Sequence, residues 1–239
     1  MISPADNGEM SFWDHLEALR WVLLRCGVVL VVLMTVLFFF KDFIFDTVIL
    51  APAKGLKLIN IEVTAQFFIH VRVTFICSLV LAFPYLAFEL WRFVAPGLYA
   101  SEKKAVRRAF GLGSGLFYAG AAFGYFVVMP LVIFFFSRYQ VSASVENTFS
   151  LGSYVSTFSA MVLIMGLLFE MPTVISVLGH LGVVTRRTLR NLRRHAVVVL
   201  LLLAAILTPT GDPFTMTVVA LPLYLLYEFS ILLCPKDEK

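Results

Sequence analysis

The sequence predicts an all-α integral membrane protein in which six transmembrane helices form one domain over residues 1–239. Hydrophobic residues make up 60% of the chain and charged residues only 14%, whereas soluble domains average roughly 45–50% and 25%. The mean hydropathy is +0.92, and 24 residues are Phe. A soluble fold of this size cannot bury so much apolar surface. This composition excludes a soluble enzyme, a disordered chain and a small secreted protein.

Six apolar stretches carry the prediction of six spans. A membrane-crossing helix needs about 20 apolar residues, and the first four stretches reach that length. In chain order the stretches are residues 21–40, 73–91, 109–136, 151–178, 196–207 and 214–233. Residues 1–20 then form an amphipathic cytoplasmic segment before the membrane region (21–233), and residues 234–239 form a cytoplasmic tail.

The fifth and sixth spans are predicted to be short. From Ala196 to Thr208 the fifth has 13 residues, a rise of about 20 Å against a hydrocarbon core of about 30 Å. Pro222 interrupts the sixth span and Glu228 marks its polar end, so a similar length is expected there. We therefore expect an undersized hairpin that thins the surrounding bilayer.

The distribution of basic residues predicts the orientation, because Lys and Arg collect in cytoplasmic loops. Thirteen of them fall on the side of the two termini and four on the other side. The thirteen are Arg20, Arg92, Lys103, Lys104, Arg107, Arg108, Arg186, Arg187, Arg190, Arg193, Arg194, Lys236 and Lys239, and the four are Lys41, Lys54, Lys57 and Arg138. Both termini are therefore expected in the cytoplasm. The excess of basic residues in cytoplasmic loops also explains the net charge of +4, so this charge does not indicate binding to nucleic acid.

Small residues and prolines predict how the helices pack and bend. Two small-xxx-small pairs in the third span should let helices approach closely, and they are Gly111, Gly115, Gly120 and Gly124. Four prolines inside predicted spans should bend them, and they are Pro84, Pro130, Pro172 and Pro222. The loop from residue 41 to 66 is longer than a turn needs, so we expect short interfacial helices around Pro52 that cap the outer face.

No enzyme signature is present in the sequence. It contains no nucleophile elbow, no Gly-rich phosphate loop and no Cys/His spacing typical of a metal site. We accordingly expect no catalytic residue, no metal and no cofactor. The remaining candidates for functional residues are carboxylates at positions where a charge is energetically costly.

Glu170 is the most conspicuous of these carboxylates because it lies inside the fourth span. A charge at membrane depth costs at least about 2.5–3.5 kcal/mol on insertion scales, so Glu170 should face a cavity, pair with a partner or be protonated. A structural hydrogen bond between helices and a functional polar site both remain open. Asp212, in the short outer loop, either caps the sixth helix or shares in such a site. Glu89 and Glu228 lie near predicted membrane edges. For each of them, a solvated carboxylate and a functional one are equally possible interpretations.

A second group of charged residues lies at the cytoplasmic surface. Asp14, Glu17 and Arg20 recur at helical spacing before the first span, and residues 93–104 set one acid, Glu102, among apolar and basic residues. Carboxylates beside a Phe/Leu/Tyr platform suit a peptide that is cationic at one point and apolar next to it. The planar guanidinium of arginine would bind them with two hydrogen bonds. A solvated charged loop is the alternative.

Several motifs in this order resemble the TatC family, the multi-spanning subunit of the twin-arginine protein translocase. They are His-Leu-Glu-Ala-Leu-Arg at 15–20, Ala-Pro at 51–52, Glu-Leu-Trp-Arg-Phe-Val-Ala-Pro-Gly-Leu-Tyr at 89–99 with Glu102, Phe-Glu-Met-Pro at 169–172, and Thr-Pro at 208–209 with Asp212. The resemblance covers essentially the whole chain. It implies six helices in a cupped, glove-like arrangement, cytoplasmic termini, short fifth and sixth helices, and a place in the bacterial inner membrane.

The resemblance also implies what the protein does. Members of the family receive the twin-arginine signal peptides of folded proteins and assemble with the single-span TatA and TatB subunits and with further copies of themselves, and export is driven by the protonmotive force. The signal-peptide site would comprise Glu17, Arg20, Phe93, Leu98, Tyr99, Glu102 and Lys103. Among these, Glu102 would bind an arginine, and Phe93, Leu98 and Tyr99 would shape the platform. Glu170 would contact partner helices, and the functionally sensitive positions would be Pro52, Tyr125, Pro209 and Asp212.

Three departures from the family pattern affect this assignment. The N-terminal motif often has two adjacent acids, and the second position is here Ala18, which leaves Glu17 about 100° away around the helix. The outer hairpin, Pro-Thr-Gly-Asp at 209–212, is one residue longer than the common form, and Met216 stands where a Gln is frequent. A proton- or ion-coupled small-molecule transporter using Glu170 and Asp212 is the alternative function, although inverted repeats typical of such transporters are missing. A membrane scaffold without a ligand is a third possibility.

Overall fold

The computed structural model describes residues 12–95, 100–142, 144, 147–208 and 213–235, and for residues 12, 14, 100–106 and 214 it describes the backbone alone. The described chain is helical almost throughout, as the composition predicts. The long elements are α1 (Phe12–Phe38), α3 (Ala65–Val94), α4 (Ala100–Phe123), α5 (Met129–Arg138), α6 (Leu151–Phe169), α7 (Met171–His180), α9 (Arg193–Leu207) and α10 (Pro213–Leu233). The short elements are α2 (Lys41–Phe43), η1 (Ile44–Ile49), η2 (Ala51–Ala53), β1 (Leu58–Ile59), η4 (Gly124–Val128), β2 (Phe149–Ser150) and α8 (Arg186–Asn191).

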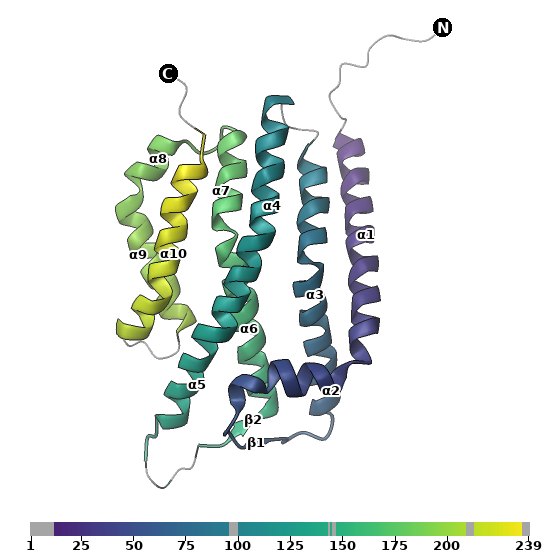
Figure 1. Ribbon diagram of the computed structural model, residues 1–239, viewed down its shortest axis with the longest axis vertical. Coiled ribbons are helices and arrows are strands. Elements are labelled where there is room, and N and C mark those ends of the chain that lie inside the picture. The colour runs from purple at the N-terminus through teal and green to yellow at the C-terminus, as the bar shows by residue number, and fades with distance from the viewer. Residues whose placement is uncertain (1–11, 96–99, 143, 145–146, 209–212, 236–239) are drawn as a thin grey trace.

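These elements make six spans. In the described part of the chain five helical stretches are long and apolar enough to cross a membrane by themselves, and α9 is the short sixth. Helix α4 continues through the π-helical η4 into α5, and α6 is followed after one residue by α7. The start of α1 and the end of α10 lie at the same end of the molecule (Figure 1), as an even number of spans requires. We call this the terminal end and the other the loop end.

The spans form a curved row, which agrees with the expected cupped arrangement. Helix α1 packs on α3, α3 on α4, α4 on α6 and α7, and α10 on both α7 and α9. Helix α4 crosses the middle of Figure 1, while α1 and the α9–α10 pair lie at opposite edges. Only 6% of the apolar window of α1 is buried inside the protein, so most of its surface faces lipid.

The fifth span is as short as predicted, whereas the expected similar length of the sixth is wrong. Helix α9 has 15 residues, about 22 Å at 1.5 Å per residue. Helix α10 has 21 residues and runs uninterrupted through Pro222, which gives about 31 Å. It is shorter than the first four spans but long enough to cross. Glu228 does not end the helix, which runs on to Leu233, and its partly exposed carboxylate binds Arg193 at 2.7 Å.

Two of the four prolines coincide with a change in helix geometry. The π-helical η4 ends directly before Met129-Pro130 at the start of α5. The α6–α7 boundary falls at Glu170, two residues before Pro172. Pro84 and Pro222 lie inside uninterrupted helices. The break therefore places the costly carboxylate at the point where the helical hydrogen-bond ladder is interrupted.

Only one of the two predicted glycine pairs makes a close helix contact. A Cβ at Gly120 would lie 2.7 Å from Phe169 Cβ, and one at Gly124 would lie 2.7 Å from the Met161 carbonyl oxygen. Gly111 and Gly115 have open space around them, so the expectation fails for this pair. The close approach nearer the start of α4 occurs instead at Gly113, which lies on the helix face turned toward α7.

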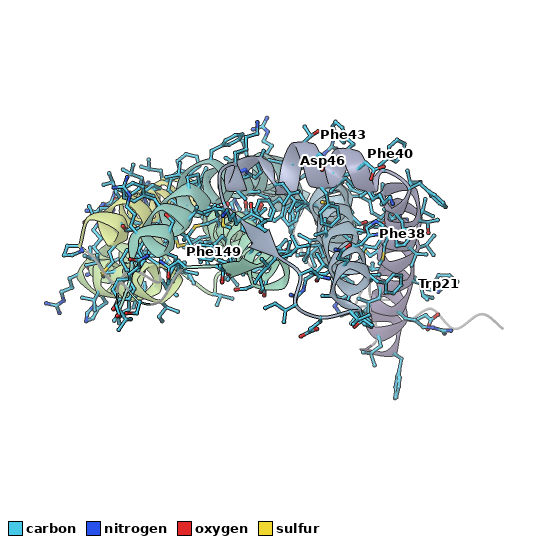
Figure 2. The ribbon with its side chains drawn as sticks, turned by 90° about the horizontal axis from the view of Figure 1, so that it is seen from below. Trp21, Phe38, Phe40, Phe43, Asp46 and Phe149 are labelled. Carbon is cyan, nitrogen blue, oxygen red and sulfur yellow. The ribbon has the colours of Figure 1, made fainter. Side chains whose placement is uncertain are left out.

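A cap of short elements closes the loop end, as the long first loop predicts. Elements α2, η1 and η2 run across this end of the bundle, and Phe40 and Phe43 project outward from the start of this segment (Figures 1 and 2). Two tyrosines fix the cap, since the Tyr125 hydroxyl donates to the Val48 carbonyl at 2.9 Å and that of Tyr154 to the Ile49 carbonyl at 2.6 Å. Parallel pairing of β1 with β2 ties the cap to the start of α6.

Candidate functional site

The terminal end carries a pocket between the first turns of α1 and the last turn of α3. The His15 ring stacks on Phe93 with centroids 4.3 Å apart. This contact closes one side of a pocket of about 240 Å³, which we call the α1–α3 pocket. Its lining residues are His15, Ala18, Trp21, Val22, Arg25, Arg92 and Phe93. The pocket combines aromatic walls with two guanidinium groups.

A buried carboxylate lies beneath this pocket. Glu89 is only 2% exposed. Its Oε2 lies 3.5 Å from Arg25 Nη1, and its Oε1 lies 3.8 Å from Arg92 Nη1. The Tyr85 hydroxyl donates to Oε1 at 3.3 Å. Glu89 is therefore neither solvated nor unpaired, and it links α1 to α3.

Sequence reasoning missed this cluster. The sequence shows Arg25 and Glu89 as single charged residues, each inside an apolar stretch or at its end. Their positions along the predicted spans could have revealed the pair, because both residues lie within about one to two helical turns of the same predicted membrane surface. One cation and one anion at the same depth in consecutive antiparallel spans are candidates for an ion pair.

Glu17 and Arg20 lie on the outside of the same end. They form an exposed pair at 3.5 Å within the second turn of α1, which runs without a break from residue 12 into the first span. Glu17 does not line the α1–α3 pocket, whereas Ala18 does. The position where the family often carries a second acid therefore faces the pocket, and Glu17 faces solvent.

The rest of the predicted signal-peptide site is only partly described. Phe93 is half-buried under His15. Leu98 and Tyr99 lie outside the described residues, as does the side chain of Asp14. Glu102 and Lys103 belong to the first turn of α4, where the backbone alone is described. The structure thus brings His15, Ala18 and Phe93 together and leaves the contacts of Glu102 as a prediction.

Glu170 lies between α4 and the α6–α7 break. Its Oε1 is buried and has no hydrogen-bond partner among the described residues. Its Oε2 lies against Gly113, because a Cβ built there would be 2.6 Å from both Oε2 and Thr173 Oγ1. The Thr173 hydroxyl donates to the Ala109 carbonyl at 3.5 Å. Gly113 and Thr173, both missed by sequence reasoning, therefore define the space around this carboxylate.

Glu228 is a second paired carboxylate that the sequence left open. It binds Arg193 at 2.7 Å and accepts a hydrogen bond from the Tyr224 hydroxyl at 3.0 Å. The nearby Tyr227 hydroxyl donates to the Leu189 carbonyl at 2.7 Å. These contacts join α8, α9 and α10 at the terminal end, so Glu228 holds the last hairpin together.

Two further predicted positions lie at or toward the loop end. Pro52 is half-buried in η2, and Tyr125 holds the cap through Val48. Pro209 and Asp212 lie outside the described residues. No cluster of three or more His, Cys, Asp or Glu side chains that could hold a metal occurs in the described part of the chain.

A wide apolar hollow of about 710 Å³ opens on the side of the row that α1, η1, α3, α4 and α6 surround. Tyr118, Tyr125 and Ser159 are the polar side chains among its mainly aliphatic and phenylalanine lining. Such a surface suits lipid chains or an apolar helix, not a polar solute.

Comparisons with known proteins agree with the motifs. The family model described as Sec-independent protein translocase protein (TatC) matches residues 14–222. A Sec-independent protein translocase protein TatC from Blattabacterium is 32% identical over 95% of this chain and 95% of its own length. One from Halothiobacillus neapolitanus is 37% identical over 95% of this chain, which spans 62% of that relative.

A solved structure leads to the same family. The crystal structure of a twin-arginine translocase receptor TatC in DDM aligns with a TM-score of 0.76 and 31% identity, over 92% of this chain and 99% of that one. A second crystal structure of this receptor aligns with a TM-score of 0.72. Proteins of this kind are components of a protein translocase and not enzymes. The chain therefore belongs to the TatC family of Sec-independent protein translocase proteins.

Proposed function

We propose that this translocase subunit receives twin-arginine signal peptides at its terminal end, on the surface made by the first turns of α1, the last turn of α3 and the first turn of α4. The observation that supports the proposal is the α1–α3 pocket, whose aromatic wall of His15 and Phe93 suits the apolar part of the peptide. Arg25 and Arg92 of its lining pair with Glu89 and do not bind the peptide's arginines. These arginines instead bind acids outside the pocket, the exposed Glu17 and Glu102 of the first turn of α4.

Each predicted residue has a role in this surface. Glu102 binds a guanidinium group of the peptide with two hydrogen bonds. Leu98, Tyr99 and Lys103 are proposed to take part in the same binding. Glu17 offers a second carboxylate. Its partner Arg20 is displaced at small cost, because an exposed ion pair contributes about 0–1 kcal/mol. The apolar part of the peptide packs on Phe93.

The terminal end faces the cytoplasm of a bacterium, so the protein lies in the inner membrane with residues 1–20 and 234–239 on the cytoplasmic side. The basic residues support this orientation, since α8 and the start of α9 alone contribute five arginines to the terminal end. The sequence count left out Arg25, at the terminal end, and Arg72, toward the loop end, and one further charge at each end leaves the asymmetry intact. The whole chain acts as one membrane domain.

TatA- and TatB-type single-span subunits and further copies of this chain are the proposed partners, and export of the folded cargo is driven by the protonmotive force. Glu170 is the proposed contact for a partner helix. A buried carboxylate oxygen without a described partner is costly in a membrane, and a polar group on an incoming helix would satisfy it. Pro52 and Tyr125 are expected to be sensitive because they shape the cap at the loop end. Pro209 and Asp212 are expected to be sensitive as well.

Photo-crosslinking tests where the peptide binds. A photoreactive phenylalanine at position 93 should form an adduct with a twin-arginine signal peptide. The same group at Tyr139, an exposed aromatic residue at the loop end, should not. Equal adducts from the two positions would contradict the proposed surface.

A further inference from the structure

A polar pocket of about 470 Å³ lies at the loop end, between the start of α3 and the start of α6. This volume falls in the range of roughly 300–1,000 Å³ that is typical of small-ligand sites. One wall is the segment Asn60–Glu62 and the other includes Ser150 and Ser153. The parallel pairing of Ile59 with Ser150 holds these two walls together. The pocket is therefore built by segments about 90 residues apart and not by one mobile loop.

One acid and one base line this pocket. Glu62 lies just before α3, and Arg72 lies about 10 Å along that helix at 1.5 Å per residue. Neither forms an ion pair with any residue that the structure describes. Both side chains are exposed, and Arg72 lies about two turns from the loop end of α3. Each charge can therefore bind a ligand group of opposite sign that enters the pocket.

The rim of the pocket is apolar and exposed. Val63 is 100% exposed, and Phe68, which lines the pocket, is 64% exposed. Phe67 and Ile61 are exposed beside them. Exposed apolar and aromatic side chains at the end of a membrane-spanning helix lie at the level of lipid headgroups. The pocket thus opens where phosphate and amine groups of lipids are found.

We propose that this pocket binds the zwitterionic phosphoethanolamine headgroup of a membrane phospholipid. The Arg72 guanidinium binds the phosphate, a geometry that arginine favours. The Glu62 carboxylate binds the ammonium group, with Asn60 and Ser153 as neighbouring polar side chains. The acyl chains lie over Phe67 and Phe68. An anionic headgroup without an amine would leave Glu62 unpaired beside a phosphate, so the site selects the zwitterion.

Native mass spectrometry of the full-length protein in detergent tests the proposal. The probes are phosphatidylethanolamine, phosphatidylglycerol with the same acyl chains, and soluble glycerophosphoethanolamine. We expect one phosphatidylethanolamine to bind about tenfold more tightly than phosphatidylglycerol. Glu62→Gln should remove most of that preference because Glu62 contacts the amine, whereas Arg72→Gln should weaken binding of both lipids about tenfold because both carry the phosphate, as for loss of one charge-assisted hydrogen bond. The controls Arg138→Gln, at the end of α5, and Asp46→Asn, in the cap, remove charges outside the pocket and should keep the preference. Asp46 is labelled in Figure 2.

Three outcomes would overturn the proposal. Equal binding of the two lipids to the unmodified protein would exclude selection of a zwitterion, and this comparison holds even if a variant folds poorly. An equal loss in pocket and control variants would show a general charge effect. Competition by glycerophosphoethanolamine at the same concentration as the lipid would assign the pocket to a soluble zwitterion. Retention of the preference in Arg72→Lys and Glu62→Asp would support the role of the two charges.

Discussion

Arg25 and Glu89 form an ion pair that joins the first two spans, with Arg25 Nη1 3.5 Å from Glu89 Oε2. Arg25 also lines the α1–α3 pocket, as does Arg92, which lies 3.8 Å from the other oxygen of the same carboxylate. A buried acid thus fixes two walls of the surface proposed for the signal peptide. The shape of the pocket therefore depends on the buried Glu89 carboxylate, although a bound peptide need not contact this carboxylate.

Removing one partner of this pair should destabilise the protein. Losing one member of a buried pair costs up to about 3–5 kcal/mol, and the cost here should be nearer 1–3 kcal/mol because Arg25 is 37% exposed. We expect Arg25→Gln to lower the thermal unfolding temperature in detergent and the double variant with Glu89→Gln to lose less than the sum. The exposed Arg20→Gln is the control and should change little. Additive effects in the double variant would show that the two residues do not interact.

Gly113→Ala should displace the Glu170 carboxylate. The added Cβ would lie 2.6 Å from Glu170 Oε2 and from Thr173 Oγ1, which is too close for either atom to stay in place. Gly111→Ala and Gly115→Ala are matched controls, since nothing lies within 4 Å of a Cβ at those positions. There, alanine should be neutral or stabilise α4 by up to about 1 kcal/mol. Thermal unfolding and export of a reporter protein would measure both effects, and three equivalent variants would refute the close approach at Gly113.

Glu170→Ala should impair assembly with partner subunits and export more than it impairs accumulation in the membrane. The reason is that Oε1 has no hydrogen-bond donor among the described residues, so removing this oxygen leaves no donor inside the described chain without its acceptor. Copurification of partner subunits and the membrane level of the protein would be measured together. Loss of the protein from the membrane would instead assign Glu170 a structural role.

Glu17→Lys should weaken signal-peptide binding about fivefold, the amount expected for an exposed charge contact of about 1 kcal/mol. Glu17 is exposed and its partner Arg20 is held only at 3.5 Å, so the fold should tolerate the change. Fluorescence anisotropy of a labelled peptide would measure the affinity. An unchanged affinity would mean that Glu17 takes no part and that Ala18 marks the loss of an acid from this chain.

Much of the fold follows from apolar length alone. The spans, the short α9 and the capped loop end were predictable because burial in lipid requires a minimum helix length, and a loop of 26 residues must fold onto something. The length of α10 was not predicted in this way, because neither Pro222 nor Glu228, which pairs with Arg193 from 35 residues earlier, ends the helix. Position along the chain cannot show that a carboxylate has found a partner on another helix.

The site was predictable only in part for the same reason. Glu170 could be singled out because a lone charge in an apolar span is costly. The glycine contact was misassigned because a small-xxx-small pattern does not say which face of α4 meets α7, and Gly113 lies two residues from each predicted position. Arg25 and Glu89 were missed because their compensation is visible only when α1 and α3 are side by side.

The most direct test of the central claim is the affinity of the purified protein for a labelled twin-arginine signal peptide, compared with a peptide in which both arginines are lysines. We predict that this exchange and Glu102→Gln each weaken binding at least about tenfold, as loss of bidentate, charge-assisted hydrogen bonds requires. Glu62→Gln at the loop end should have no effect. Binding that ignores the arginine exchange and Glu102→Gln alike would show nonspecific apolar capture and contradict the receptor role.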